Sequence, residues 1–337
     1  MEPAARKKQI LSAIVESFIQ TGEPVGSKTL INEAGLKVSS ATVRNDMADL
    51  TEQGYIIQPH TSAGRIPTQL GYRYYVDNAL RLQPIAESGR GYILESLSQN
   101  TDSPESILQS AANLLNRLTD CIALTTTPNG EESRIRKISF VPTGAHSAMA
   151  VVIASNGVIK TKLFRCEFII TPEILEVFDR ALNEVFAGVR LSSVNRPFIQ
   201  TAAAGFGELS FLMPSALMAV KDACETAREV SVCHSGLGGL IRFAQAGRLY
   251  EFIQNRHDLA NMLERLPLTT AVTIGKENSR IELAASSVIS TRYTIDGNPS
   301  GVLAVVGPLR MDYARNISII NCVSDCVSEL FNETIDY

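Results

Sequence analysis

Residues 39–54 have the sequence SSATVRNDMADLTEQG, and this stretch decides how the N-terminal part of the chain folds. Two serines open it, and a serine at a helix N-cap accepts a hydrogen bond from the free N–H groups of the first turn. Gly54 ends the helix, because glycine readily adopts the left-handed conformation that follows many helices. Val43, Met47 and Leu50 recur at helical spacing, so the sequence predicts a helix over 41–53 with one buried side.

The other side of this helix carries Arg44 and Asn45 among small residues. In a helix-turn-helix the first turn of such a helix enters the major groove, where Arg binds guanine and Asn binds adenine through paired hydrogen bonds. Hydroxyl groups and free helix N–H groups hold phosphates. We therefore expect this to be a DNA recognition helix, with contacts from Ser39, Ser40, Ala41, Thr42, Arg44 and Asn45.

Further elements on both sides complete the pattern. A helix with one apolar face is predicted over 4–20, and Ser27 is a suitable N-cap for a short second helix. After the recognition helix, residues 55–58 and 65–67 predict a two-stranded ribbon around a glycine-bearing tip, which is the wing of a winged helix. Thr68 caps a fourth helix over 69–82. The second helix and the wing add the candidate DNA contacts Ser27, His60, Thr61, Ser62 and Arg65.

Two questions stay open at this point. Residues 1–82 contain nine Lys and Arg against eight Asp and Glu, a net charge of +1, whereas nucleic-acid binders are usually more basic. A helical module that docks another protein would fit this composition as well. Arg65 has two possible roles too, because it either contacts phosphate or pairs with Asp77 or Glu52 and holds the ribbon.

Several longer motifs resemble those of the HrcA family of heat-inducible transcription repressors. In the N-terminal part they are EPVGS at 23–27, SSATVRNDM at 39–47, QPHTSAGRIPT at 58–68 and GYRYY at 71–75. Near the C-terminus IGKEN at 274–278 and GPLRMDY at 307–313 resemble a second signature of the same family. The resemblance extends over essentially the whole chain.

The resemblance implies an α+β multidomain protein, in which a winged helix-turn-helix precedes a GAF-like α+β sheet domain interrupted by an inserted dimerisation domain. It also implies a homodimer that binds double-stranded DNA at an inverted-repeat operator upstream of chaperone operons. A chaperonin is implied as the partner that keeps the repressor active, so that heat releases the genes. The expected functional keywords are transcription regulation, repression, DNA binding and the heat-shock stress response.

The periodicity of the remaining sequence agrees with an interrupted sheet domain. Strand-like stretches lie on both sides of a mixed, mainly helical stretch, and hairpin turns are predicted at Asn156-Gly157 and at 296–301. We expect a winged helix at 1–82, a hinge at 83–106 that encloses a short helix around 92–97, a sheet domain formed by 107–190 and 265–337, and an insert at 191–264. The insert concentrates apolar residues that either form a local core or serve as dimerisation contacts, namely Phe206, Leu209, Phe211, Leu212 and Met213.

Composition excludes several classes of protein. With 45% hydrophobic residues the chain is not globally disordered, and a net charge of −4 over 337 residues excludes a generally basic nucleic-acid coat. Six cysteines without a C-x-x-C pair argue against a structural zinc site and for reduced thiols in the cytoplasm. We expect no membrane span, no metal and no cofactor.

An enzyme is the rival from a different class, and the chain lacks the usual catalytic motifs that would support one. The nearer alternative is an effector-responsive regulator with a small-molecule ligand in the GAF-like domain. Arg310 and Asp312, beside Gly307-Pro308, either bind such a ligand or pair locally at a turn between a strand and a helix.

Overall fold

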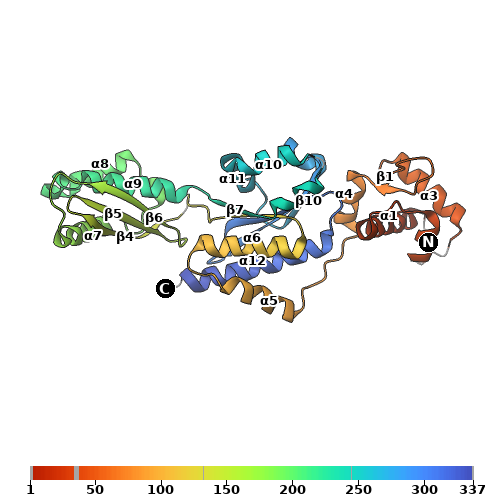
Figure 1. Ribbon diagram of the computed structural model, residues 1–337, viewed down its shortest axis with the longest axis horizontal. Coiled ribbons are helices and arrows are strands. Elements are labelled where there is room, and N and C mark those ends of the chain that lie inside the picture. The colour runs from red at the N-terminus through yellow and green to blue at the C-terminus, as the bar shows by residue number, and fades with distance from the viewer. Residues whose placement is uncertain (1–2, 34–37, 132, 244, 336–337) are drawn as a thin grey trace.

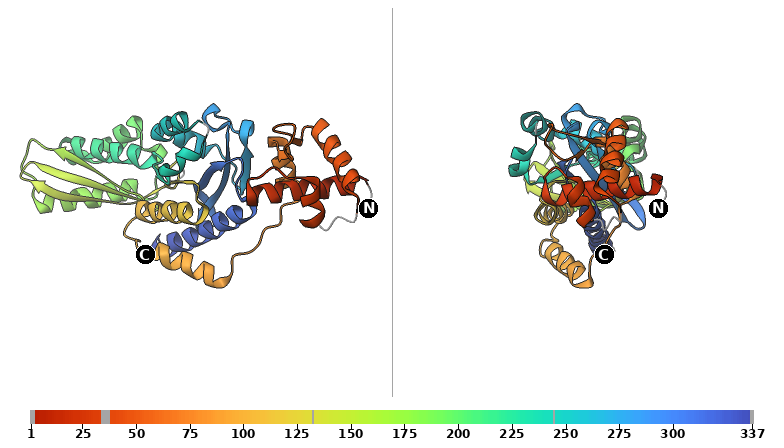
Figure 2. Two further views of the ribbon diagram at one scale, coloured as in Figure 1. Left: turned by 45° about the vertical axis from the view of Figure 1, so that its right-hand side comes forward. Right: turned by 90° about the vertical axis from the view of Figure 1, so that its right-hand side faces the viewer.

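The computed structural model describes residues 3–33, 38–131, 133–243 and 245–335. It is elongated and consists of three units in a row (Figure 1). The N-terminal head lies at one end, a five-stranded sheet with its helices lies in the middle, and a smaller three-stranded unit lies at the other end. A second direction of view shows the same order (Figure 2).

The head contains the elements that the sequence predicts. Its helices surround a core to which α1, α3 and α4 contribute, and the short ribbon follows α3 directly. In chain order the elements are α1 (Pro3–Thr21), α2 (Ser27–Glu33), α3 (Ser40–Glu52), β1 (Ile56–Ile57), β2 (Ile66–Pro67) and α4 (Gln69–Asn78). This is the winged helix-turn-helix arrangement.

The middle unit is an antiparallel sheet in the order β7-β3-β10-β9-β8. Its strands are β3 (Ile122–Thr126), β7 (Val232–Ser235), β8 (Ala271–Ile274), β9 (Ser286–Ile295) and β10 (Asn298–Pro308). One face packs against α6 (Pro104–Thr119) and α12 (Tyr313–Ile335), and the other against α10 (Ala246–Gln254) and α11 (Arg256–Glu264). The predicted hairpin between β9 and β10 is confirmed, but its turn is shorter than expected, with left-handed residues only at Asp296 and Gly297.

The helix predicted within the hinge at 83–106 is confirmed, but it is longer than expected and leaves little of the hinge. Residues Glu87–Ser98 form α5, a helix that contacts α6 and α12 and buries Ile93 and Leu97. The glycines that suggested a hinge lie within or beside this helix. Only residues 79–86, between α4 and α5, form an extended connection between the head and the sheet.

The boundaries of the insertion also differ from the expectation. Strands β4 (Ile135–Gly144), β5 (Ser147–Ala154) and β6 (Ile159–Arg165) pair only with one another, and not with the five-stranded sheet. With α7 (Pro172–Phe186), α8 (Arg196–Gly205) and α9 (Pro214–Arg228) they enclose a core of their own. The inserted unit therefore lies between β3 and β7, whereas β7, α10 and α11, which were assigned to the insert, belong to the sheet domain.

The reason for the difference is that alternation of apolar residues defines which face of a strand is buried and does not define its neighbour. Short hairpins let β4, β5 and β6 pair as a meander, with the predicted turn at Asn156-Gly157 between β5 and β6.

One of the expected dimerisation residues is corrected as well: Met213 is fully buried in the core of the inserted unit.

Residues 138–159, the longest stretch without charged side chains, fall in β4, in β5 and in the turns that lead to the first residue of β6. Among the helices of the described residues, none has the length and apolar character needed to cross a bilayer.

Candidate nucleic-acid interface

The start of α3 is built as the sequence predicts. Ser39 is the N-cap, with extended backbone angles, and its Oγ accepts a hydrogen bond from the N–H of Thr42 at 3.2 Å. Ala41, Arg44 and Asn45 are exposed, while Val43, Met47 and Leu50 are buried in the head. The candidate reading face of α3 therefore points to solvent in the described structure.

A buried ion pair fixes the orientation of α3. Asp46 is only 4% exposed, and its carboxylate accepts hydrogen bonds from Arg6 Nε at 2.6 Å and Arg6 Nη2 at 3.2 Å. The hydrogen bond to Asp46 raises the pKa of Arg6. A second pair, Lys7 with Asp49 at 2.6 Å, lies farther along the same two helices. Because both pairs join α1 to α3, they hold the recognition helix against the helix behind it.

Sequence reasoning missed these two pairs. The available signal was that Asp46 lies beside the apolar seam formed by Val43, Met47 and Leu50. Buried carboxylates are rare unless they are paired, so this position called for a basic partner on another helix.

Three of the predicted DNA contacts meet where α2 and α3 begin. The Oγ atoms of Ser27 and Ser40 are 3.1 Å apart, and Arg44 Nε donates a hydrogen bond to Ser27 Oγ at 3.4 Å. The arginine is thus held beside two helix N-termini while its side chain stays exposed. Hydroxyls and N-terminal N–H groups at this point form a surface suited to a phosphate group.

The tip of the wing is organised by a residue that the sequence analysis did not select. Gln58 Nε2 donates hydrogen bonds to the carbonyl oxygens of Thr61 and Ala63, both at 3.0 Å. His60 Nδ1 lies 3.2 Å from Ser62 Oγ. His60, Thr61 and Ser62 are all exposed, as expected for residues that approach a DNA backbone.

Arg65 lies at the base of the wing and not at its tip. Its backbone exchanges two hydrogen bonds of 2.9 Å with Val25, and its Nε donates to Thr51 Oγ1 on α3 at 3.2 Å. Neither Asp77 nor Glu52 forms an ion pair with it among the described residues, and Asp77 pairs instead with Arg73. Arg65 therefore helps to fix the wing to α3 and to the segment before α2, and the residue is only partly exposed.

The comparisons with known proteins agree with this geometry. The family model described as "HrcA protein C terminal domain" matches residues 105–317, and a DeoR-like helix-turn-helix domain matches residues 32–69. The heat-inducible transcription repressor HrcA of Desulfitobacterium hafniense is 31% identical and that of Nitratidesulfovibrio vulgaris 34% identical. The first alignment covers 98% of each chain, and the second 97% of this chain and 96% of the relative.

A solved structure supports the fold at the level of the whole chain. The crystal structure of a hypothetical protein has a TM-score of 0.63 and 24% identity, and the match covers 98% of both chains.

The contact between the wing and the segment before α2 generates a prediction about stability. A Cβ on Gly64 would lie 2.5 Å from the backbone C and O atoms of Val25, which cannot move without breaking the Val25–Arg65 pairing. We expect Gly64→Ala to destabilise the head by about 1–3 kcal/mol, as overpacking usually does. Hydrogen exchange at the Val25 and Arg65 amides would measure the loss as faster exchange.

Gly26→Ala is the matched control, because the nearest atom to its added Cβ is Thr29 Oγ1 at 3.9 Å. Equal protection in both variants would contradict the close approach of the wing.

Proposed function

This chain belongs to the HrcA family of heat-inducible transcription repressors, and on that premise we propose that it represses chaperone operons by binding an inverted-repeat operator. The observation that carries the proposal is that Arg44 and Asn45, near the start of α3, are exposed to solvent while Asp46 is paired in the core. A recognition helix needs this combination, since its side chains must be accessible and its axis must be fixed.

We assign separate roles to two groups of residues in the N-terminal half of α3. Arg44 and Asn45 supply base contacts, and Ser39, Ser40 and Thr42 supply phosphate contacts together with Ser27. The wing tip, through His60, Thr61 and Ser62, contacts the backbone of the adjacent DNA segment. Arg65 contributes mainly by holding the wing, because its guanidinium donates to Thr51.

The protein acts as a homodimer in this proposal, because an inverted repeat presents two half-sites related by a twofold axis. The inserted unit offers the surface for it. One face of its sheet is covered by α7 and α9, whereas the other carries an uncovered row of partly or fully exposed apolar side chains: Val141, Met149, Val151, Ile153, Ile159 and Leu163. We call this the open sheet face.

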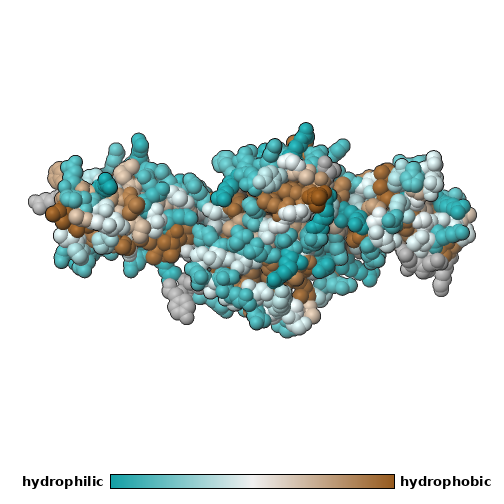
Figure 3. Space-filling model, viewed as in Figure 1, coloured by the Kyte–Doolittle hydropathy of each residue, from teal (hydrophilic) through white to brown (hydrophobic). Residues whose placement is uncertain are grey.

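The open sheet face is a better candidate than the cluster expected from the sequence. Phe206 and Leu209 pack against the core of their own unit and Met213 lies within it, so only Phe211 and Leu212 remain available. Figure 3 shows apolar patches on the inserted unit, at the end of the molecule opposite the head. In this proposal the inserted unit is the dimerisation domain and the five-stranded sheet with its helices is the GAF-like domain.

In the same proposal a chaperonin of the cytoplasm modulates the protein by binding the subunit before it dimerises. A subunit that has not yet dimerised exposes the open sheet face, where Leu163 is 71% exposed. Exposed apolar surface of this kind makes a chain dependent on chaperones. Heat would occupy the chaperonin with other unfolded chains and thereby lower the amount of active repressor.

An effector-responsive regulator is the second candidate. A pocket of about 470 Å³ lies between the 81–93 segment and the start of α12, with Arg81 and Arg315 among its lining residues. A thermal-shift screen of metabolites separates the two candidates, because an effector that fills this pocket would raise the melting temperature.

The assignment of the reading face is tested by Arg44→Ala and Asn45→Ala. Each lost base contact should cost about 1–3 kcal/mol of preference for the operator over random DNA, with unchanged circular dichroism. Fluorescence anisotropy with both duplexes measures the preference. Glu52→Ala, an exposed position at the far end of α3, is the control and should keep it. Full preference in the Arg44 and Asn45 variants would refute the role of this face.

The dimer interface is tested by Leu163→Glu, which places a charge on the open sheet face at its β6 edge. We expect a monomer by light scattering, because burying an unpaired carboxylate in an apolar interface is strongly unfavourable. Leu268→Glu is the matched control, since Leu268 is 67% exposed and lies outside the inserted unit. A dimer in both variants would place the interface elsewhere.

A further inference from the structure

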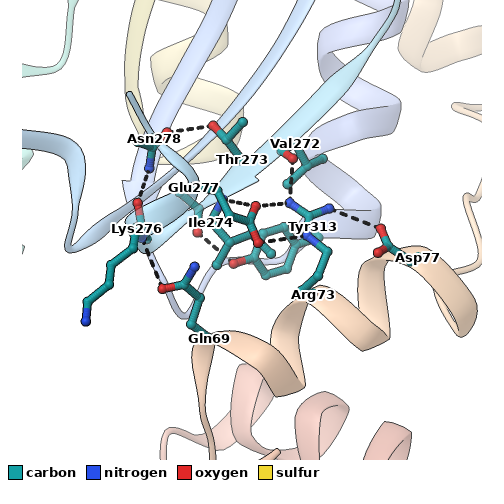
Figure 4. Close-up of polar contacts among 12 residues, drawn as sticks. Gln69, Arg73, Asp77, Val272, Thr273, Ile274, Lys276, Glu277, Asn278 and Tyr313 are labelled. Carbon is teal, nitrogen blue, oxygen red and sulfur yellow. Dashed lines mark hydrogen bonds and ion pairs between the residues drawn. The ribbon is translucent and has the colours of Figure 1, made fainter. Parts of the chain in front are cut away.

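Arg73 of α4 is one of the residues that join the head to the sheet domain. Arg73 Nε donates to Glu277 Oε1 at 3.0 Å, and its Nη2 donates to the carbonyl oxygen of Val272 at 2.6 Å and also to Glu277 Oε2. The third nitrogen, Nη1, donates to Asp77 of the same helix at 3.1 Å. Figure 4 shows the guanidinium between these three partners, with Glu277 and Val272 coming from the edge of the sheet.

The acceptor side is a turn that its own hydrogen bonds make rigid. Glu277 Oε2 accepts from the N–H of Ile274 at 2.9 Å, and the Asn278 side chain ties the turn to the Gly275 carbonyl at 2.8 Å. Gly275 has a φ of +57°, which favours glycine, and a Cβ there would lie 2.6 Å from Gln69 Oε1. Gln69 Oε1 accepts from the N–H of Lys276 at 3.0 Å, so α4 contacts this turn at two points one helical turn apart.

The second C-terminal motif completes the contact. The rings of Tyr72 and Tyr313 are 5.9 Å apart, and the Tyr313 hydroxyl donates to the Leu309 carbonyl at 2.7 Å. Arg310 Nη1 donates at 3.4 Å to the carbonyl oxygens of Phe18 and Ile19, close to the C-terminus of α1. We call Val272, the 274–278 turn and residues 309–313 the socket.

The ion pair in the socket is partly buried and bidentate, unlike most ion pairs on a protein surface. The side chains of Arg73 and Glu277 are 25% and 31% exposed, and the pairing is bidentate. Burial alone would raise the pKa of Glu277, but the hydrogen bonds from Arg73 and from the Ile274 N–H outweigh it and lower the pKa. The buried apolar residues of the head and of the α12 side of the sheet form one continuous cluster around Tyr72 and Tyr313.

The covalent connection cannot orient the head by itself. Residues 79–86 contain no regular element, and an extended segment of that length reaches roughly 28 Å. Without the socket the head would be tethered but free to rotate. In Figure 1 α4 faces the sheet and α3 lies at the far end of the head, so the socket acts on orientation without touching the reading face.

We propose that the socket is a positioning device, and that Arg73 and Glu277 set the spacing between operator half-sites that the dimer accepts. This inference rests on the proposed function. Two heads held rigidly on elongated subunits can engage both half-sites at one spacing only, because effective concentration is lost when geometry forbids simultaneous binding. Heads that are released from the socket accept many spacings, each with less gain from the second contact.

The test measures affinity for duplexes that carry two half-sites separated by spacers increasing in single base pairs over one helical turn, and for a duplex with one half-site. The wild-type affinity should peak at one spacing and fall by roughly tenfold or more elsewhere, as avidity is lost. Arg73→Leu and Glu277→Gln should flatten this profile and leave half-site affinity unchanged. Arg73→Lys keeps the charge but cannot bridge Glu277 and Val272 at once, so its profile should be intermediate.

Asp77→Asn is the matched control, because Asp77 binds Arg73 within α4 and makes no contact with the socket. It should keep the wild-type profile.

Trypsin cleavage after the exposed Arg81 supplies a readout without DNA. Cleavage should become faster in Arg73→Leu and Glu277→Gln.

Two results would overturn the inference. One is an unchanged spacing profile in Arg73→Leu and Glu277→Gln, and the other is an equal loss of affinity for every duplex including the half-site, which would mean that the contact only stabilises the head. Failure of the wild-type chain to dimerise or to prefer any operator is a distinct result. It would overturn the proposed function itself, and the inference with it.

Discussion

The antiparallel pairing of β3 with β10 is the contact on which the arrangement of the whole chain depends. Residues 122–125 lie opposite residues 303–306. The chain between them contains the inserted unit and the other three strands of the sheet, and it must therefore start and end at this one sheet. The pairing places β7 at one edge of the sheet and β8 at the other. The inserted unit precedes β7 and the head docks at β8, so the sheet separates the proposed dimerisation surface from the proposed DNA surface (Figure 2).

Elements with local causes could be predicted from the sequence, and long-range partners could not. The cap at Ser39, the buried seam of α3 and the turn at Asn156-Gly157 each depend on a few neighbouring residues. Which sheet a strand joins depends on residues far away, which is why β4 to β6 were assigned to the wrong sheet. Arg65 shows the same limit, because its polar surroundings suggested a wing tip while its backbone pairs with Val25.

Ion pairs between elements distant in the chain were the other features that the sequence did not reveal. Arg6 with Asp46 and Arg73 with Glu277 join residues of opposite charge that are distant in the chain, and many arginines and acids could have paired. The two pairs act in series, because the first fixes α3 within the head and the second fixes the head on the sheet. The IGKEN and GPLRMDY motifs, which sequence analysis could assign only to a family, acquire a physical role as the two halves of the socket.

The most direct measurement of the central claim is selection of binding sites by the full chain from a pool of random duplexes. If α3 reads DNA in a symmetric dimer, the enriched sequences will contain an inverted repeat with a fixed spacing between its halves. Their affinity will exceed that of random DNA by about a thousandfold or more and fall steeply with salt. Enrichment of no common sequence, or binding that is equal for selected and random duplexes at every salt concentration, would contradict the account.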